Sequence, residues 1–117
     1  MRFNAAVPAC LAALSMLTAA HAQAPGALQV VTPDQYRALP VAERQLYVAG
    51  VLDTMLGFNL PTHAMFAQCL PGVTASQLVQ VVDQRLPNLP PVERSDMPVA
   101  VHNALLHACL DRGYKME

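Results

Sequence analysis

Four helical stretches follow one another after residue 31, and the longest runs from about Pro40 to Leu56. Its apolar side chains recur at helical spacing over an arc that is too wide for a surface helix, which predicts the central helix of the fold. Gly57 is placed to stop this helix, and Glu43 lies near its positive end. The pattern therefore predicts an all-α fold, a small bundle of four to five helices.

Two of the other helices begin with the same capping signature. Thr32 with Gln35, and Thr74 with Gln77, place a hydroxyl and an amide three residues apart, which is the pattern of a capping box. A proline is expected to close each of these helices, because proline cannot continue the hydrogen-bond ladder. These closing residues are Pro40 and Pro87.

The last helix is capped by Ser95 and Asp96 and ends near Arg112 and Gly113. Its core residues recur at helical spacing, so Cys109 is predicted to face the core with them. They are Met97, Val101, Ala104, Leu105 and Ala108.

Two proline-containing segments connect these helices. Residues 58–72 are predicted to be a connection with about one helical turn near Ala64. Residues 87–94 hold three prolines and are predicted to be stiff and extended, projecting a defined loop.

Gly50 and Asp53 share one side of the long helix with Ala49 and Gly57. A glycine inside a helix costs roughly 1 kcal/mol relative to alanine, so Gly50 predicts that another backbone packs close by. We expect that backbone to belong to the same core. The alternative is a helix of another molecule, which would make this face a homodimer contact. For Asp53 we expect a backbone or arginine partner rather than a catalytic role.

The N-terminus is typical of an export signal. Arg2 precedes an uncharged run rich in alanine and leucine, and Ala20-His21-Ala22 is a small-residue cleavage site. We predict a signal peptide at residues 1–22, with cleavage after Ala24 as the alternative, a flexible lead at residues 23–31 and one domain at residues 32–115. Cys10 gives a weak lipidation signal with almost no apolar run before it. The expected location is the periplasm, and no membrane span is expected after cleavage.

Cys69 and Cys109 are the two cysteines that remain after residue 22, so a single pairing is available in an oxidising compartment. Closing this loop is worth about 4 kcal/mol on the chain-entropy account. We therefore predict one disulfide between them.

Charge and chemistry exclude several classes of function. The segment after residue 22 keeps six of the seven basic residues and all eight acidic ones, so no basic field attracts nucleic acid. His102 and His107 lie five apart, unlike the four-residue spacing of zinc-binding helices. We expect no metal, no cofactor and no enzymatic activity, since a bridged cysteine leaves no free thiol.

Two segments carry a resemblance to a known family. Residues 46–53, Leu-Tyr-Val-Ala-Gly-Val-Leu-Asp, and residues 69–82, which begin Cys-Leu-Pro-Gly-Val-Thr, resemble the Rap/Tai family of periplasmic immunity proteins. Asn103-Ala104-Leu105 with Cys109 continues the likeness. The chain departs from the family at His107-Ala108, where Phe-Pro is frequent, and at Gln84-Arg85, where an aromatic residue is common.

The resemblance implies a helical, disulfide-bonded binding protein that neutralises a peptidoglycan amidase effector delivered by type VI secretion. From the loop chemistry alone, we expect residues 87–94 to contact the partner through four exposed side chains, or else to act only as a rigid spacer. The four side chains are Asn88, Leu89, Glu93 and Arg94. An HdeA-like periplasmic acid-stress chaperone is the alternative function, and a structural envelope subunit is a third.

Overall fold

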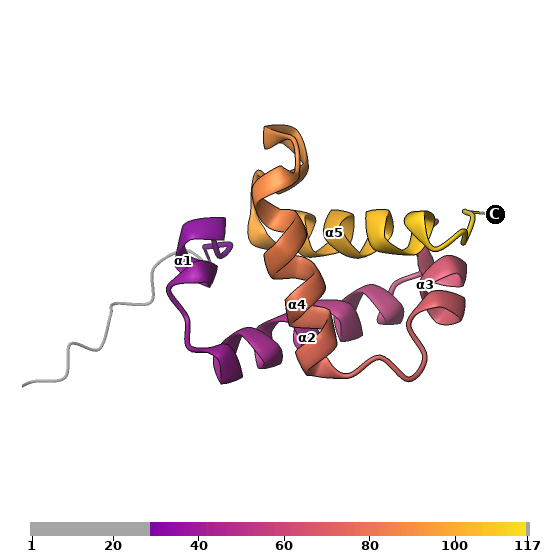
Figure 1. Ribbon diagram of the computed structural model, residues 1–117, viewed down its shortest axis with the longest axis horizontal. Coiled ribbons are helices and arrows are strands. Elements are labelled where there is room, and N and C mark those ends of the chain that lie inside the picture. Colours follow the sequence, from indigo (N-terminus) through magenta and orange to yellow (C-terminus); the bar gives the residue numbers. More distant parts are fainter. Residues whose placement is uncertain (1–28, 117) are drawn as a thin grey trace, which may run out of the picture.

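Helices and short 3-10 turns make up the computed structural model over residues 29–116, which is the part of the chain that it describes (Figure 1). No β-strand occurs in that range, so the predicted all-α class is confirmed. The predicted signal peptide and most of the predicted lead lie outside the described residues. The elements are α1 (Pro33–Arg37), α2 (Val41–Gly57), α3 (His63–Cys69), α4 (Ala75–Arg85), η1 (Leu86–Asn88), η2 (Pro91–Arg94) and α5 (Met97–Asp111).

The predicted caps are present. Thr32 accepts a hydrogen bond from the Gln35 N–H, and the Gln35 side chain accepts one from the Thr32 N–H. Thr74 and Gln77 form the same reciprocal pair at the start of α4. The Asp96 carboxylate accepts from the Val99 N–H at 3.0 Å and caps α5. Local sequence therefore sets where these three helices begin.

The central helix is α5, and the prediction that α2 would be central was wrong. Six residues of α5 are buried, whereas Val48 is the only buried residue of α2. Figure 1 shows α4 crossing both α2 and α5. The apolar arc of α2 is wider than the face that its neighbours cover, so part of it stays exposed. The buried residues of α5 are Met97, Ala100, Val101, Ala104, Leu105 and Cys109.

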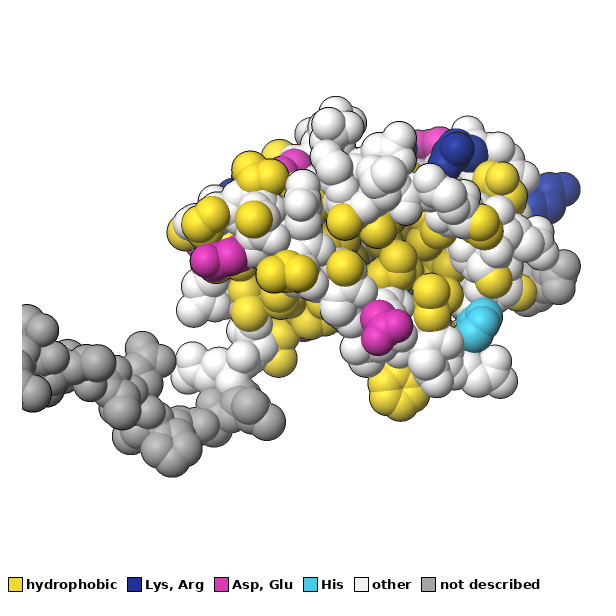
Figure 2. All heavy atoms as spheres, turned by 90° about the horizontal axis from the view of Figure 1, so that it is seen from below, with side chains coloured by type: hydrophobic (Ala, Val, Ile, Leu, Met, Phe, Trp, Pro, Cys, Tyr) yellow, Lys and Arg dark blue, Asp and Glu magenta, His cyan; other side chains and the backbone are white. Residues whose placement is uncertain are grey.

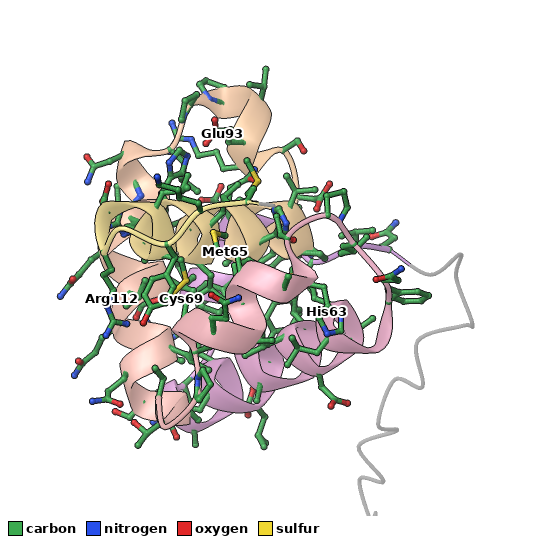
Figure 3. The ribbon with its side chains drawn as sticks, turned by 90° about the vertical axis from the view of Figure 1, so that its right-hand side faces the viewer. His63, Met65, Cys69, Glu93 and Arg112 are labelled. Atoms are coloured by element: carbon green, nitrogen blue, oxygen red, sulfur yellow. A yellow bond between two sulfur atoms is a disulfide. The ribbon has the colours of Figure 1, made fainter. Side chains whose placement is uncertain are left out.

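The disulfide joins the end of α3 to the last turn of α5. Cys69 and Cys109 are bonded, with their Cα atoms 5.8 Å apart, and both are buried. Figure 3 shows the labelled Cys69 within the body of the bundle, far from Glu93. The predicted pairing is confirmed, and it fixes α3 to the central helix.

Several boundaries differ from the sequence prediction. Residues 63–69 form a two-turn helix rather than one turn near Ala64. Gly57 is the last residue of α2, and the helix ends because Phe58 turns extended. Residues 86–88 and 91–94 fold as two 3-10 turns, and the predicted extended backbone is limited to Leu89 and Pro90 between them. The proline φ of about −65° fits a 3-10 turn as well as an extended chain, so proline content did not distinguish them.

Both ends of the domain are tied to α5. The Met97 N–H donates to the Val31 carbonyl oxygen at 2.8 Å, so the end of the predicted lead belongs to the folded unit. At the other end, Gly113 has a φ of +89°, and the N–H groups of Gly113 and Tyr114 donate to Leu110 and Cys109. This pattern is a Schellman motif, which needs a left-handed residue that glycine adopts without strain.

Candidate functional site

The 3-10 loop, residues 86–94, connects α4 to α5 and stands at the upper end of the molecule in Figure 1. It contains the four residues that the sequence suggested for partner contact. The structure brings them into one loop but gives them different roles. Asn88 is exposed, and its Nδ2 donates to the Gln84 carbonyl oxygen at 3.3 Å.

Leu89 is the internal anchor of the 3-10 loop. Its side chain is 6% exposed and belongs to the main hydrophobic core. The expectation that Leu89 is an exposed contact was therefore wrong, because its extended backbone between the two 3-10 turns places the side chain against the core. Leu86, the first residue of the loop, is also buried and anchors the start of the loop.

Glu93 and Arg94 are half-buried and already engaged. The Glu93 carboxylate lies 2.7 Å from His107 Nε2, and the Glu93 carbonyl oxygen accepts from Asn103 Nδ2 at 3.1 Å. Arg94 Nη1 lies 3.5 Å from the carbonyl oxygen of Pro87. These contacts hold the 3-10 loop in one shape, and Figure 3 shows Glu93 at the end of the molecule that the loop forms.

Val92 is the residue that sequence reasoning missed. Its side chain is 81% exposed, the highest value among the large apolar side chains of the described residues. The run Pro90-Pro91-Val92 gave a signal, because an apolar residue directly follows two prolines that restrict the backbone. An exposed apolar side chain on a rigid loop is a common anchor in protein interfaces.

A hollow of about 220 Å³ lies between the 3-10 loop and the helices beneath it. It is lined by Arg85, Asn88, Leu89, Pro90 and His107. Arg85 is paired there with Asp111 at 2.8 Å, and His107 is paired with Glu93. Arg85 and His107 each already contact a carboxylate, so neither side chain is free to bind a small anion in this hollow.

A second, wider hollow of about 450 Å³ runs along the outer face of α2. Figure 2 shows a hollowed face of the molecule where apolar side chains gather. We call this feature the α2 groove. No charged side chain lines it, and its residues are Gln29, Val30, Val31, Leu46, Tyr47, Gly50, Val51, Thr54 and Pro98.

Gly50 lies open in the α2 groove. A Cβ atom built on Gly50 would meet no atom within 4 Å, so the expected close packing inside one core was wrong. The reason is that α4 and α5 cover the opposite side of α2, where Val48 is buried. Asp53 is exposed, and among the described residues its carboxylate contacts neither the backbone nor an arginine, so the expected partner is not found.

Tyr36 and Tyr47 connect the α2 groove to the core. Their rings lie 5.8 Å apart, and burial raises the pKa of both phenols. A hydrogen bond to Asp83 further raises the pKa of Tyr36, while the carboxylate of Asp96 adds to the rise for Tyr47. Both phenols therefore stay neutral at physiological pH.

Thr62, His102 and Asn103 form a chain of hydrogen bonds that resembles a catalytic triad in its order. Thr62 Oγ1 lies 3.0 Å from His102 Nε2, and His102 Nδ1 lies 3.1 Å from Asn103 Oδ1. A nucleophile must reach its substrate, however, and Thr62 is only 6% exposed and lines neither hollow. This chain of hydrogen bonds joins the start of α3 to α5.

The described residues contain no group of three or more histidine, cysteine or acidic side chains arranged to hold a metal ion. Within the same range, no helix is both long and apolar enough to cross a membrane. Comparisons with protein-family models, curated proteins and solved structures find no match to this chain.

Proposed function

We propose that this chain is an exported, non-enzymatic binding protein of the periplasm that neutralises a peptidoglycan amidase effector of a type VI secretion system. The resemblance of residues 46–53 and 69–82 to Rap/Tai immunity proteins supports this class of partner. The observation that carries the binding role is the 3-10 loop. It is rigid, anchored by Leu89, and offers Val92 to solvent.

Occlusion is the mechanism that this loop suits. An inhibitor that places a rigid loop in an active-site cleft blocks substrate without any chemistry of its own. Three prolines and the contacts of Glu93 order the loop before binding, which lowers the entropy cost of association. Val92 would then be the central apolar anchor, with Asn88 and Arg94 at the polar rim.

A neutral-pH pull-down tests the proposed class of partner. The oxidised, tagged protein is the bait against periplasmic and secreted fractions, with mass spectrometry as the readout. A stoichiometric wall amidase supports the proposal, and the absence of any wall hydrolase contradicts it. Val92→Asp should abolish capture, whereas Val41→Asp, the same change at another exposed valine, should retain it.

A second copy of this chain is a further candidate partner, at the α2 groove. Leu46 projects from α2 with 75% of its area exposed, and Gly50 leaves a space one turn away. If a two-fold axis passes between two copies at this point, the Leu46 of each copy lies over the Gly50 of the other, as an isologous contact requires. Sedimentation should show a dimer that Leu46→Asp abolishes and that Leu110→Asp, on exposed α5 surface, leaves intact.

The acid-stress chaperone is the alternative function, and one observation favours it. Phe58 and Leu60, in the turn after α2, are 62% and 39% exposed, so they add apolar surface beyond the α2 groove. A chaperone would expand near pH 2 to 3 and hold many unfolded proteins. Light scattering of a denatured client at that pH separates the two functions, because an inhibitor of one folded enzyme should not suppress its aggregation.

A further inference from the structure

Three hydrogen bonds in series run from the start of α3 across α5 to η2. Thr62 contacts His102, and His102 contacts Asn103. Asn103 continues the series, because its Nδ2 donates to the main-chain oxygen of Glu93 at 3.1 Å. Two neighbouring side chains of α5 therefore connect the 3-10 loop to a segment that lies on the other side of α4 in the sequence.

The carbonyl oxygen of Glu93 decides the direction of the whole series. A carbonyl oxygen can only accept, so the Asn103 atom that faces it is the amide nitrogen. The other end of that amide, Oδ1, also only accepts, and it lies 3.1 Å from His102 Nδ1. His102 Nδ1 therefore carries a hydrogen. A neutral imidazole has one N–H, so Nε2 is left to accept from the Thr62 hydroxyl at 3.0 Å.

The other neutral tautomer of His102 does not fit this arrangement. With its hydrogen on Nε2, the ring would donate to Thr62, and Nδ1 would need a donor from Asn103. Turning the Asn103 amide to supply that donor would place Oδ1 against the Glu93 oxygen, and two acceptors repel each other. The second tautomer is therefore compatible only with an η2 that has lost its contact with Asn103.

Phe66 fixes the ring in which this choice is made. It is 1% exposed and meets the imidazole edge-on, with 5.6 Å between the ring centroids. Both nitrogens of His102 have partners in this orientation, and a half-turn of the ring would present carbon atoms to both. The position of the hydrogen is therefore set by the hydrogen bond that each nitrogen makes.

η2 depends on the series because it has little packing of its own. None of its four residues is buried. Glu93 ties it to α5 twice, and the two ties differ in kind: His107 contacts the side-chain carboxylate, whereas Asn103 holds the main chain. The main-chain contact is the one that sets how the backbone runs through Val92, which is next to Glu93 in the loop.

We propose that His102 is a positioning residue of the 3-10 loop and acts on it through Asn103. With its hydrogen on Nδ1, the imidazole holds the Asn103 amide in the one orientation that fastens the main chain of η2. The seating of η2 and the tautomer of His102 are coupled, so each biases the other. For the partner, this role rests on the proposed function, because the seated loop is the one that presents Val92.

Nitrogen-15 NMR of the free, oxidised protein at pH 8.5 reads the tautomer directly. This pH lies above the usual titration range of histidine, and the shifts of the two ring nitrogens show which one carries the hydrogen. In the wild type it should be Nδ1 of His102. Asn103→Leu should shift the ring toward the Nε2–H form, whereas Asn88→Leu, at an exposed asparagine of the loop, should not. An Nε2–H ring in the wild type, or no shift in Asn103→Leu, overturns the proposal.

Amide hydrogen exchange measures how firmly η2 is seated. His102→Phe keeps a ring against Phe66 but cannot donate to Asn103, so protection of the amides of residues 92–95 should fall about three- to tenfold, the effect of one hydrogen bond. His102→Asn, whose amide nitrogen takes the place of Nδ1, should retain more protection than His102→Phe. His63→Phe, at a histidine outside the series, is the control and should match the wild type. Wild-type protection in His102→Phe contradicts the proposal.

The captured amidase separates this role from the proposed function. If the loop is the partner-binding element, the amidase should raise protection of the amides of residues 92–95, and the wild-type ring should keep its hydrogen on Nδ1. If the amidase binds without raising that protection, the loop is not its contact, while the result on the free protein still supports His102 as a positioning residue. An Nε2–H ring in the free protein defeats that role whatever the amidase does.

Discussion

The Tyr36 hydroxyl donates a hydrogen bond of 3.0 Å to Oδ1 of Asp83, 47 residues further along the chain. Arg44 forms a salt bridge to the other oxygen of the same carboxylate, and its guanidinium lies 6.0 Å from the Tyr36 ring centre. One acidic side chain on α4 thereby holds both α1 and α2. The short α1 has five residues and buries Tyr36 completely in the core, and the contact with Asp83 adds to that packing in fixing its position.

Removing the Tyr36 hydroxyl should change how stability responds to alkaline pH. Burial and Asp83 raise the pKa of Tyr36, so the folded state retains a proton that the unfolded state loses above about pH 10. The stabilisation is complete below pH 10 and declines as the pH rises. Tyr36→Phe has no phenol to titrate and should lack this decline. Above pH 10 the free energy of unfolding of the wild type should therefore fall by about 1.4 kcal/mol per pH unit relative to that of the variant.

Urea unfolding of wild type and Tyr36→Phe at pH 8, 10 and 11 measures that difference. At pH 8 the variant should be less stable by roughly 1 to 2 kcal/mol, for the lost hydrogen bond to a carboxylate. Tyr114→Phe is a control at a partly exposed tyrosine for which no comparable contact is present. Parallel pH profiles for wild type and Tyr36→Phe would contradict the account.

Gly50→Ala should stabilise the isolated chain. The new Cβ would meet nothing within 4 Å, and alanine is favoured over glycine in a helix by roughly 1 kcal/mol. Thermal unfolding should therefore give a higher midpoint at low protein concentration. A lower midpoint under these conditions would mean that a close neighbour occupies the space within the same molecule.

Gly50 illustrates where sequence reasoning succeeds and where it stops. The capping boxes at Thr32 and Thr74 are local, because two residues within a four-residue segment contain all the groups involved, and they were predicted correctly. Which face of α2 is covered depends on how α4 and α5 pack, and that is a long-range property. The same apolar pattern fits a central helix and a helix with an uncovered face, so periodicity could not decide between them.

Opening the disulfide should cost about 4 kcal/mol, because the bond closes a loop across 40 residues of sequence separation. The double variant Cys69→Ser, Cys109→Ser should have a lower urea midpoint than the oxidised wild type. The reduced wild type should behave like the variant. If reduction left the midpoint unchanged, α3 would be held to α5 by packing alone.

The sequence predicted where the candidate loop lies but not which of its side chains face the core. Prolines and loop length identified residues 87–94 as a rigid projecting segment, which is a local inference. The inward turn of Leu89 and the outward turn of Val92 depend on the 3-10 geometry of the loop over α5, and composition does not contain that information. The His107 contact joins two elements 14 residues apart and could not be read from helix periodicity.

Leu89 and Val92 should therefore respond to substitution in opposite ways. Leu89→Ala removes a buried side chain and should lower the free energy of unfolding by about 2 to 4 kcal/mol. Val92→Ala removes an exposed one and should change it by less than about 0.5 kcal/mol while weakening partner capture. Urea unfolding and affinity measured on the same two samples check both roles. A Val92 variant that is unstable, or a Leu89 variant of unchanged stability, would contradict the assignment of Leu89 to the core and of Val92 to the surface.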